Sequence, residues 1–291
     1  MRTQMSHPAT TRRNFTLALL LGLLALSSQP GRMLAADVAQ GDSWPGKKSQ
    51  WHGYDRFDFD AAGRPCYVVV PKQMAAGHPW VWRTTFPDFH AEADIALLGR
   101  GVLIAHLSTS DLLGSPAAVA EGERFYELLT TKHQLSKKVV LEGVSRGGLL
   151  AYNFAVKHPD QVACIYCDTP VLDFKSWPGG KGKGVGSPGD WVAVLTHYKL
   201  NEAEALAYPG NPVDNAEALA KAKLPILHIV AEDDRVVPPA ENTYLLKSRL
   251  EKLGGTMEVI SVPNGTKQSQ GHHFTHPDPQ RVVEFIVKHT K

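Results

Sequence analysis

The stretch VVLEGVSRGG, residues 139–148, decides the fold of this chain. Its first part, Val139 to Glu142, is apolar and β-branched, which predicts a buried strand. Helical spacing begins at Gly147, so Ser145 stands on a sharp turn between a strand and a helix. Glycines two residues before and two residues after the serine leave room for that turn, because a side chain at either place would clash. The stretch therefore predicts a nucleophilic serine, and a plain glycine-rich turn is the alternative.

The alternation of strand and helix continues on both sides of this stretch. Strands are predicted at residues 66–70, 80–82, 102–107, 139–142, 162–167, 224–230 and 257–262, and helices at residues 91–99, 115–133, 147–158, 241–253 and 280–289. Several strands are continuous apolar runs, which is typical of a parallel sheet that is buried on both faces. Because crossovers between parallel strands are right-handed, the sequence predicts an α/β fold with a doubly wound, mostly parallel sheet.

The segment between the strands at 162–167 and 224–230 is too long for an ordinary connection. It contains a glycine-rich run at residues 178–189, then two pieces with helical character at residues 191–198 and 201–208. We expect a cap, inserted at about residues 169–222, over the carboxyl edge of the sheet. A phosphate-binding loop is not favoured, because the required glycine spacing and Lys-Ser/Thr pair are missing.

The first 36 residues have the composition of a targeting segment. They contain four arginines and no acidic residue. Three of the arginines precede an apolar run from Leu17 to Leu26, which is too short for a permanent membrane span. The sequence TRRNF at residues 11–15 resembles a twin-arginine export signal, and a general secretory signal is the alternative. We expect cleavage near Ala35-Ala36, export to the periplasm or beyond, and a mature domain of residues 37–291.

Charge and cysteine content exclude several classes of protein. The chain has 31 basic and 29 acidic residues, and without the leader the formal charge is −2, which argues against a nucleic-acid partner. Three cysteines are too few for a disulfide scaffold. Cys164 and Cys167 fall on one predicted buried strand with their side chains on opposite faces, so we expect structural thiols instead of a redox or metal pair. The sequence leaves the oligomeric state open.

Across about residues 50–290, the serine turn and its strand–helix context resemble the α/β-hydrolase family. In that family the nucleophile is followed by an acid just past a late strand and then by a histidine. The resemblance implies Asp234 as the acid, because Asp234 precedes the sequence Arg-Val-Val-Pro, a pattern that family members often show. Asp233 and Asp168 stay open as alternatives, and one of the paired aspartates could instead cap a helix.

The same resemblance points to a loop after the last strand for the histidine. Gly271-His272 matches the usual Gly-His of the family, and His273 is the alternative. A metal site formed by His272, His273 and His276 is not favoured, because no cysteine or acidic ligand is interleaved with them. No metal and no cofactor are therefore expected.

The resemblance also implies an oxyanion site. One donor is the backbone N–H of Arg146, and the second is expected from Arg83 or Thr84, although the His-Gly-Gly pattern of lipases is missing there. The G-x-S-R-G sequence resembles elbows in some peptidases and in glucuronoyl esterases. We expect the side chains of Arg146 and Arg83 to bind an anionic or polyhydroxylated substrate. The alternative for Arg146 is a pair with a surface carboxylate.

These expectations combine into a function. Trp177 and Trp191 in the predicted cap suit a sugar ring or an aromatic acyl group, or they pack inside the cap. We expect a serine hydrolase that cleaves carboxylic esters, of a small molecule or a glycan, through an acyl-Ser145 intermediate. The first alternative is a serine peptidase that resembles the prolyl-oligopeptidase catalytic domain, which needs a further upstream domain where only about 40 residues precede the core. The second is a catalytically silent binding protein on the same fold.

Overall fold

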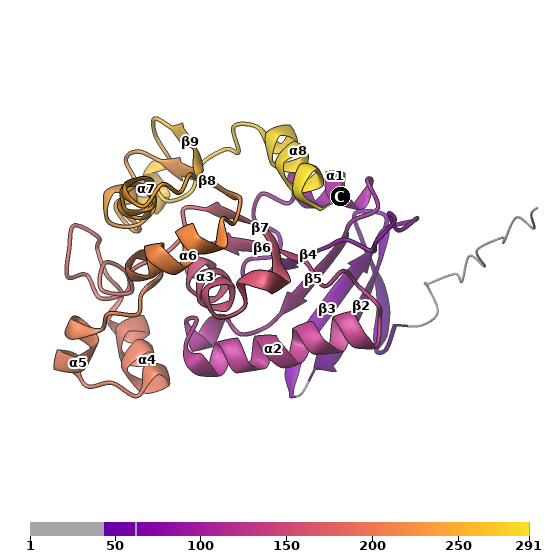
Figure 1. Cartoon of the computed structure of the whole chain (residues 1–291), viewed down its shortest axis with the longest axis horizontal. Coiled ribbons are helices and arrows are strands. Elements are labelled where there is room, and N and C mark those ends of the chain that lie inside the picture. The colour runs from indigo at the N-terminus through magenta and orange to yellow at the C-terminus, as the bar shows by residue number, and fades with distance from the viewer. Residues whose placement is uncertain (1–43, 62, 291) are drawn as a thin grey trace, which may run out of the picture. The chain divides into compact units, whose positions relative to one another are not determined.

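The protein, described by a computed structural model over residues 44–61 and 63–290, is built on a nine-stranded sheet in the order β1-β2-β3-β5-β4-β6-β7-β8-β9 (Figure 1). The six strands from β5 to β9 in this order run parallel, and β1, β2 and β3 join them as antiparallel neighbours. The strands are β1 (Lys47–Trp51), β2 (Tyr54–Ala61), β3 (Arg64–Val70), β4 (Trp80–Arg83), β5 (Leu103–Leu107), β6 (Val139–Val144), β7 (Val162–Asp168), β8 (Ile226–Ala231) and β9 (Glu258–Val262). The predicted α/β class with a doubly wound, mostly parallel sheet is confirmed.

Helices cover both faces of the sheet. One face packs against α1 (Glu92–Leu98) and α8 (Pro279–His289). The other packs against α2 (Pro116–Thr131), α3 (Gly147–Lys157), α6 (Ala216–Ala222) and α7 (Thr243–Lys252). Single turns of 3-10 helix occur at Ser110–Leu112, Pro159–Gln161, Pro212–Asn215, Pro239–Glu241 and Lys267–Ser269.

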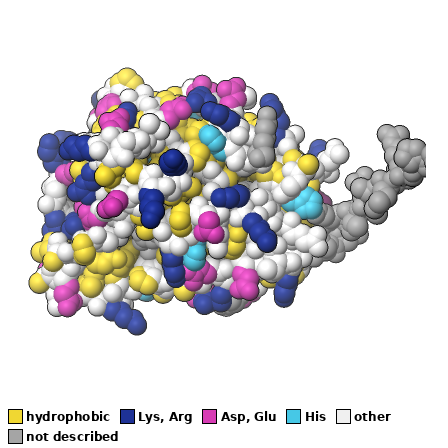
Figure 2. All heavy atoms as spheres, in the orientation of Figure 1, with side chains coloured by type: hydrophobic (Ala, Val, Ile, Leu, Met, Phe, Trp, Pro, Cys, Tyr) yellow, Lys and Arg dark blue, Asp and Glu magenta, His cyan; other side chains and the backbone are white. Residues whose placement is uncertain are grey.

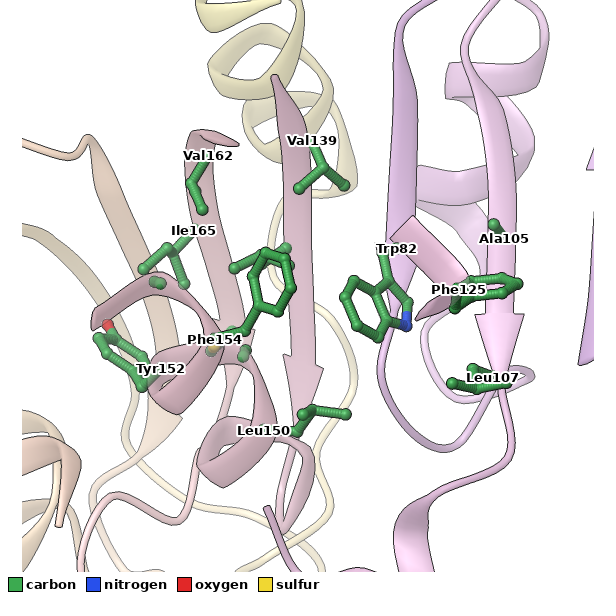
Figure 3. Packing of buried hydrophobic residues seen from close by; sticks show 14 of the residues in the cluster. Trp82, Ala105, Leu107, Phe125, Val139, Leu150, Tyr152, Phe154, Val162 and Ile165 are labelled. Atoms are coloured by element: carbon green, nitrogen blue, oxygen red, sulfur yellow. The ribbon is translucent and has the colours of Figure 1, made fainter. Parts of the chain in front are cut away.

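Trp82 of β4 lies at the centre of the second face. Its indole packs edge-on between Phe125 of α2 and Phe154 of α3, with ring centroids 5.7 and 5.1 Å away (Figure 3). Gly122 in the middle of α2 is required here, because a Cβ at that position would meet the indole ring. Close approach of α2 to the sheet therefore offsets the entropic cost of a glycine inside a helix.

The hairpin β1–β2 was not among the predicted strands. In β2, Phe57 and Ala61 are buried, while Asp58 and Asp60 alternate with them. This two-residue period is typical of a half-buried antiparallel strand. The signal was present in the sequence but is less apolar than the central strands.

The residues expected to form a cap contain α4 (Pro188–Tyr198), α5 (Glu202–Ala207) and α6. The first two share a separate apolar cluster with the loop that follows β7, centred on Phe174. Helix α6 instead packs into the core beneath the sheet. Apolar side chains gather on the visible surface where α4 and α5 lie, and Val192 and Leu206 are 61% and 44% exposed there (Figure 2).

The three cysteines are free and buried. Cys164 and Cys167 of β7 face opposite sides of the sheet, one toward the α1–α8 layer and the other toward the α2–α3 layer. Burial raises the pKa of both thiols, and it raises the pKa of Cys66 in β3 to about 12. The predicted burial of Cys164 and Cys167 on opposite faces of one strand is confirmed.

The expected signal peptide, its twin-arginine motif and the cleavage site near Ala35-Ala36 lie outside the described residues. Within residues 44–61 and 63–290, none of the helices combines the length and the apolar character that a membrane crossing requires.

Candidate active site

Ser145 lies on the turn between β6 and α3, with the positive φ of 50° that a sharp elbow imposes on its nucleophile. Both glycines around it are needed. A Cβ on Gly143 would lie 3.0 Å from the Cys167 sulfur and 3.1 Å from the backbone of Gly147. A Cβ on Gly147 would meet the hydroxyls of Thr84 and Thr85. A side chain at either glycine would therefore clash with its neighbours, as the sequence predicted.

The structure brings Ser145, His272 and Asp234 together in a hydrogen-bonded chain. His272 Nε2 lies 2.9 Å from Ser145 Oγ, and His272 Nδ1 lies 2.7 Å from Asp234 Oδ2. All three side chains are buried, with 9%, 7% and 4% of each residue exposed in the order serine, histidine, aspartate. This arrangement allows the imidazole to take a proton from the hydroxyl while the carboxylate fixes its tautomer.

The alternatives for the acid and the histidine lie elsewhere. Asp233 accepts the backbone N–H of Gly265, 2.7 Å away, at the surface. His273 is exposed, and its backbone N–H donates to Ser269 Oγ. Asp168 at the end of β7 pairs with His90, not with His272. The geometry therefore selects Asp234 and His272.

Thr169, which directly follows β7, also lies in the site, and no motif in the sequence marks it. Its hydroxyl donates to Asp234 Oδ2 at 2.8 Å and lies 2.9 Å from His272 Nδ1. The other carboxylate oxygen of Asp234 accepts the backbone N–H groups of Val236 and Val237 at 2.8 and 2.9 Å. With each oxygen hydrogen-bonded, the carboxylate is held in place beside His272.

Arg83 does not reach the substrate side of the site, so this prediction is wrong. Its guanidinium is fully buried and pairs with Asp94 of α1 at 2.6 Å and with Glu142 of β6 at 2.7 Å. It also donates to the carbonyl oxygens of Phe86 and Phe89. Arg83 therefore holds the loop after β4 through the carbonyl oxygens of that loop. Its buried guanidinium does not bind an anionic ligand.

Thr84 is not placed to supply the second oxyanion donor. Its backbone N–H donates to Glu142 O at 2.9 Å, and its buried hydroxyl donates to the carbonyl oxygens of Glu142 and Gly147. Both donors of Thr84 are thus used to join β4 to the elbow, and that prediction is also wrong.

The side chain of Arg146 turns toward α4. Two guanidinium nitrogens lie 3.0 and 3.2 Å from the carboxylate of Asp190 in α4, and the group lies over the ring of Trp177 at 4.8 Å. The alternative of a carboxylate partner is the one that the structure shows. Trp191 packs on Phe174 and donates from its indole N–H to Glu202. Both tryptophans are buried in the apolar cluster around Phe174, with 6% and 8% of the residue exposed, so they offer no open stacking surface for a sugar.

Comparison with sequence profiles of protein families matches residues 125–291 to the prolyl oligopeptidase family. The matched part, which is more than half of the chain, runs from α2 through the elbow to the residues after α8 and includes Ser145, Asp234 and His272. Comparison with curated protein sequences gives no match.

Solved structures with the same fold include several peptidases. A puromycin-hydrolyzing peptidase of Mycobacterium tuberculosis superposes with a TM-score of 0.61 at 12% identity, covering 81% of this chain and 39% of the other. An acylaminoacyl peptidase of Pyrococcus horikoshii gives 0.59 at 14% identity, covering 81% and 41%. Dipeptidyl peptidase 4 of Porphyromonas gingivalis gives 0.61 at 12% identity, covering 84% and 36%. The chain spans about two fifths of the length of these structures.

The expectation of a carboxylic ester hydrolase is wrong, and the family match is the finding that overturns it. The buried positions of Arg83, Trp177 and Trp191 remove the side chains on which a glycan ester was argued. The expected serine-type hydrolase on an α/β-hydrolase fold is confirmed. This chain belongs to the prolyl oligopeptidase family of serine hydrolases.

Proposed function

We propose that the protein is a serine peptidase that hydrolyses amide bonds with Ser145, His272 and Asp234 as its catalytic residues. The observation that carries the proposal is the match of residues 125–291 to the prolyl oligopeptidase family, since that segment contains the whole hydrogen-bonded chain. The short contact of His272 Nε2 with Ser145 Oγ supports it. In amide cleavage one imidazole nitrogen takes the proton of the serine hydroxyl and then donates it to the leaving amine.

The chemistry follows in two acyl-transfer steps. Ser145 Oγ attacks the scissile carbonyl while His272 Nε2 takes its proton, and Asp234 stabilises the imidazolium that forms. His272 then donates that proton to the leaving amine, and the C–N bond breaks to leave an acyl-Ser145. A water molecule, deprotonated by the same imidazole, hydrolyses the acyl ester, and the proton returns to Ser145 Oγ.

The tetrahedral oxyanion needs two donors in this scheme. The backbone N–H of Arg146 stands directly after the nucleophile, at the start of α3. The second donor is expected from the backbone of the loop that follows Thr84, because Thr84 itself is engaged with Glu142 and Gly147. The guanidinium of Arg83 supports that loop by donating hydrogen bonds to the carbonyl oxygens of Phe86 and Phe89.

Short peptides and aminoacyl amides are the proposed substrates. The solved structures similar to this chain are named as puromycin-hydrolyzing, acylaminoacyl and dipeptidyl peptidases, and each name describes an enzyme acting on a small or terminal aminoacyl unit.

A fluorophosphonate probe followed by intact mass tests the proposal. The wild-type protein and the variant Ser145→Ala are treated side by side, with Ser248→Ala as the matched control, since Ser248 is an exposed serine of α7. The same proteins then receive aminoacyl and dipeptidyl coumarylamides, and p-nitrophenyl acetate. We expect labelling and amide hydrolysis by the wild type and by Ser248→Ala, and neither by Ser145→Ala.

Two results would contradict the proposal. Labelling that persists in Ser145→Ala would place the nucleophile elsewhere. Cleavage of the ester without cleavage of any amide, by a protein that labels at Ser145, would refute the peptidase assignment while leaving the serine hydrolase intact.

We also propose that the protein is exported, and this proposal depends only on the sequence of residues 1–36. The motif at residues 11–15 supports the twin-arginine route. Replacement of Arg12 and Arg13 by lysine should then retain the precursor in the cytoplasm, as read by fractionation and by the mass of the mature N-terminus.

A further inference from the structure

A second histidine–aspartate pair lies behind the active site. His90, in the loop between β4 and α1, has its Nδ1 2.8 Å from Asp168 Oδ2 at the end of β7. Its Nε2 lies 2.7 Å from the carbonyl oxygen of Phe274, two residues after His272. The imidazole thus bridges the sheet edge and the loop that carries the histidine of the active site. Its side chain is only 8% exposed, and that of Asp168 is 1% exposed.

Both partners of His90 are acceptors. A backbone carbonyl has no proton to give, and Asp168 already receives the phenolic O–H of Tyr166 at 2.7 Å on its other oxygen. The proton of that phenol is committed to Asp168, because His276 Nδ1 accepts the N–H of Asp278 and its Nε2 therefore donates to the tyrosine oxygen. An imidazole that contacts two acceptors at these distances carries a proton on each nitrogen. His90 therefore fits its two partners as an imidazolium, with a proton on each nitrogen.

The charges around His90 favour this state. Burial opposes it, but the hydrogen bond and charge of Asp168, the carbonyl of Phe274 and the charge of Glu92 on α1 together raise the pKa of His90. Two other imidazoles face it from the histidine loop, with His276 edge-on at 5.1 Å, and burial lowers the pKa of both His273 and His276. The pKa of each of these neighbours is lowered where that of His90 is raised, so His90 holds a second proton more readily than they do.

We propose that His90 is a positioning residue which, with a proton on each ring nitrogen, ties the loop of His272 to Asp168 and so holds the imidazole of His272 against Ser145. Asp168 serves the same end from its backbone, since its carbonyl oxygen accepts the N–H of Ser145 at 3.0 Å. One residue of β7 therefore fixes the nucleophile through its main chain and the base through its side chain. The inference rests on the proposed function for His272, while the tie itself does not.

Loss of one proton from His90 breaks one of the two hydrogen bonds. The rate of Ser145 acylation should then fall at alkaline pH as His90 loses its charge. A displacement of the base by a fraction of an ångström is enough for a large change in rate.

The test measures the pH profile of fluorophosphonate labelling in three variants of the full chain. In His90→Gln, whose amide does not titrate, we expect labelling about 10- to 100-fold slower at the optimum and no alkaline fall. In Asp168→Asn, the alkaline fall should move to lower pH by about 1 to 3 units, because an anion in contact with His90 is removed. The control His197→Gln, at a half-buried position of α4, should keep the wild-type rate and the alkaline fall.

Hydrogen–deuterium exchange of residues 264–276 gives a readout that needs no activity. Below the alkaline limb the loop should exchange faster in His90→Gln than in the wild type, and above it the two proteins should converge. An alkaline limb unchanged in His90→Gln, or equal exchange at every pH, would overturn the inference. A wild type that shows the exchange difference but never labels would instead refute the proposed function. If His90→Gln does not fold, an unmoved limb in Asp168→Asn overturns the inference.

Discussion

The buried cluster of Arg83, Asp94 and Glu142 makes the sharpest prediction about stability. In Arg83→Met, a side chain of similar length loses its charge and five hydrogen bonds. Asp94 and Glu142 are then left 1% and 2% exposed without a cation. The loop carbonyls of Phe86 and Phe89 lose their donor as well.

The size of the effect follows from the burial of the partners. Removing one member of a buried ion pair typically costs about 3 to 5 kcal/mol, because an uncompensated charge stays behind. Burial raises the pKa of Glu142 even beside Arg83, because its ionised form is poorly solvated there. We therefore expect a loss of about 3 to 5 kcal/mol in the free energy of unfolding. Glu142→Gln added to Arg83→Met should cost less than the sum of the single changes, by more than about 1 kcal/mol.

Urea unfolding followed by the fluorescence of the six tryptophans measures these changes. Arg281→Met is the matched control, since Arg281 pairs with Glu258 while both are more than a third exposed, and its loss should cost less than about 1 kcal/mol. If Arg83→Met unfolds within about 1 kcal/mol of the wild type, the guanidinium does not compensate buried charge, and the reasoning fails.

Further predictions concern the elbow, the acid and the core. Gly147→Ala should destabilise by about 1 to 3 kcal/mol and slow fluorophosphonate labelling, since its Cβ meets two hydroxyls, while Gly189→Ala meets nothing within 4 Å and should be neutral or stabilising in thermal unfolding. Thr169→Val removes a hydrogen bond to Asp234 and should slow amide hydrolysis about 3- to 10-fold, with Thr169→Ser restoring the rate. Burial lowers the pKa of His228 to about 3, so the folded state keeps it neutral while the unfolded state protonates it. Its contribution to stability is present above the ordinary histidine pKa and declines as pH falls toward 3, and His228→Gln should flatten that decline in urea midpoints measured between pH 7 and 4.

The parallel half of the fold could be predicted because its signals are local. The strand–turn–helix around Ser145 combines a β-branched run, two glycines and a helical period within 20 residues. The hairpin β1–β2 was harder, because acidic residues on its solvent face dilute the apolar signal of Phe57. A sheet edge that faces water on one side differs less from loop composition than a strand buried on both faces.

The candidate site shows where such reasoning ends. Ser145, Asp234 and His272 were found because each follows a strand in a fixed chain order. Arg83 also follows a strand, but its partner Glu142 lies 59 residues away, so its direction depends on tertiary contacts. For the same reason Thr169 and His90 passed unnoticed, since each acts only through a neighbour that the fold supplies.

The burial of all three thiols has a practical consequence for measurement. A maleimide reacts with thiolates, and deep burial with raised pKa values keeps Cys66, Cys164 and Cys167 both inaccessible and protonated. A cysteine introduced at Val192, which is 61% exposed on α4, would therefore be the single reactive sulfur among residues 44–61 and 63–290. A fluorophore attached there would report the movement of α4 relative to the sheet during turnover, without removal of any native cysteine.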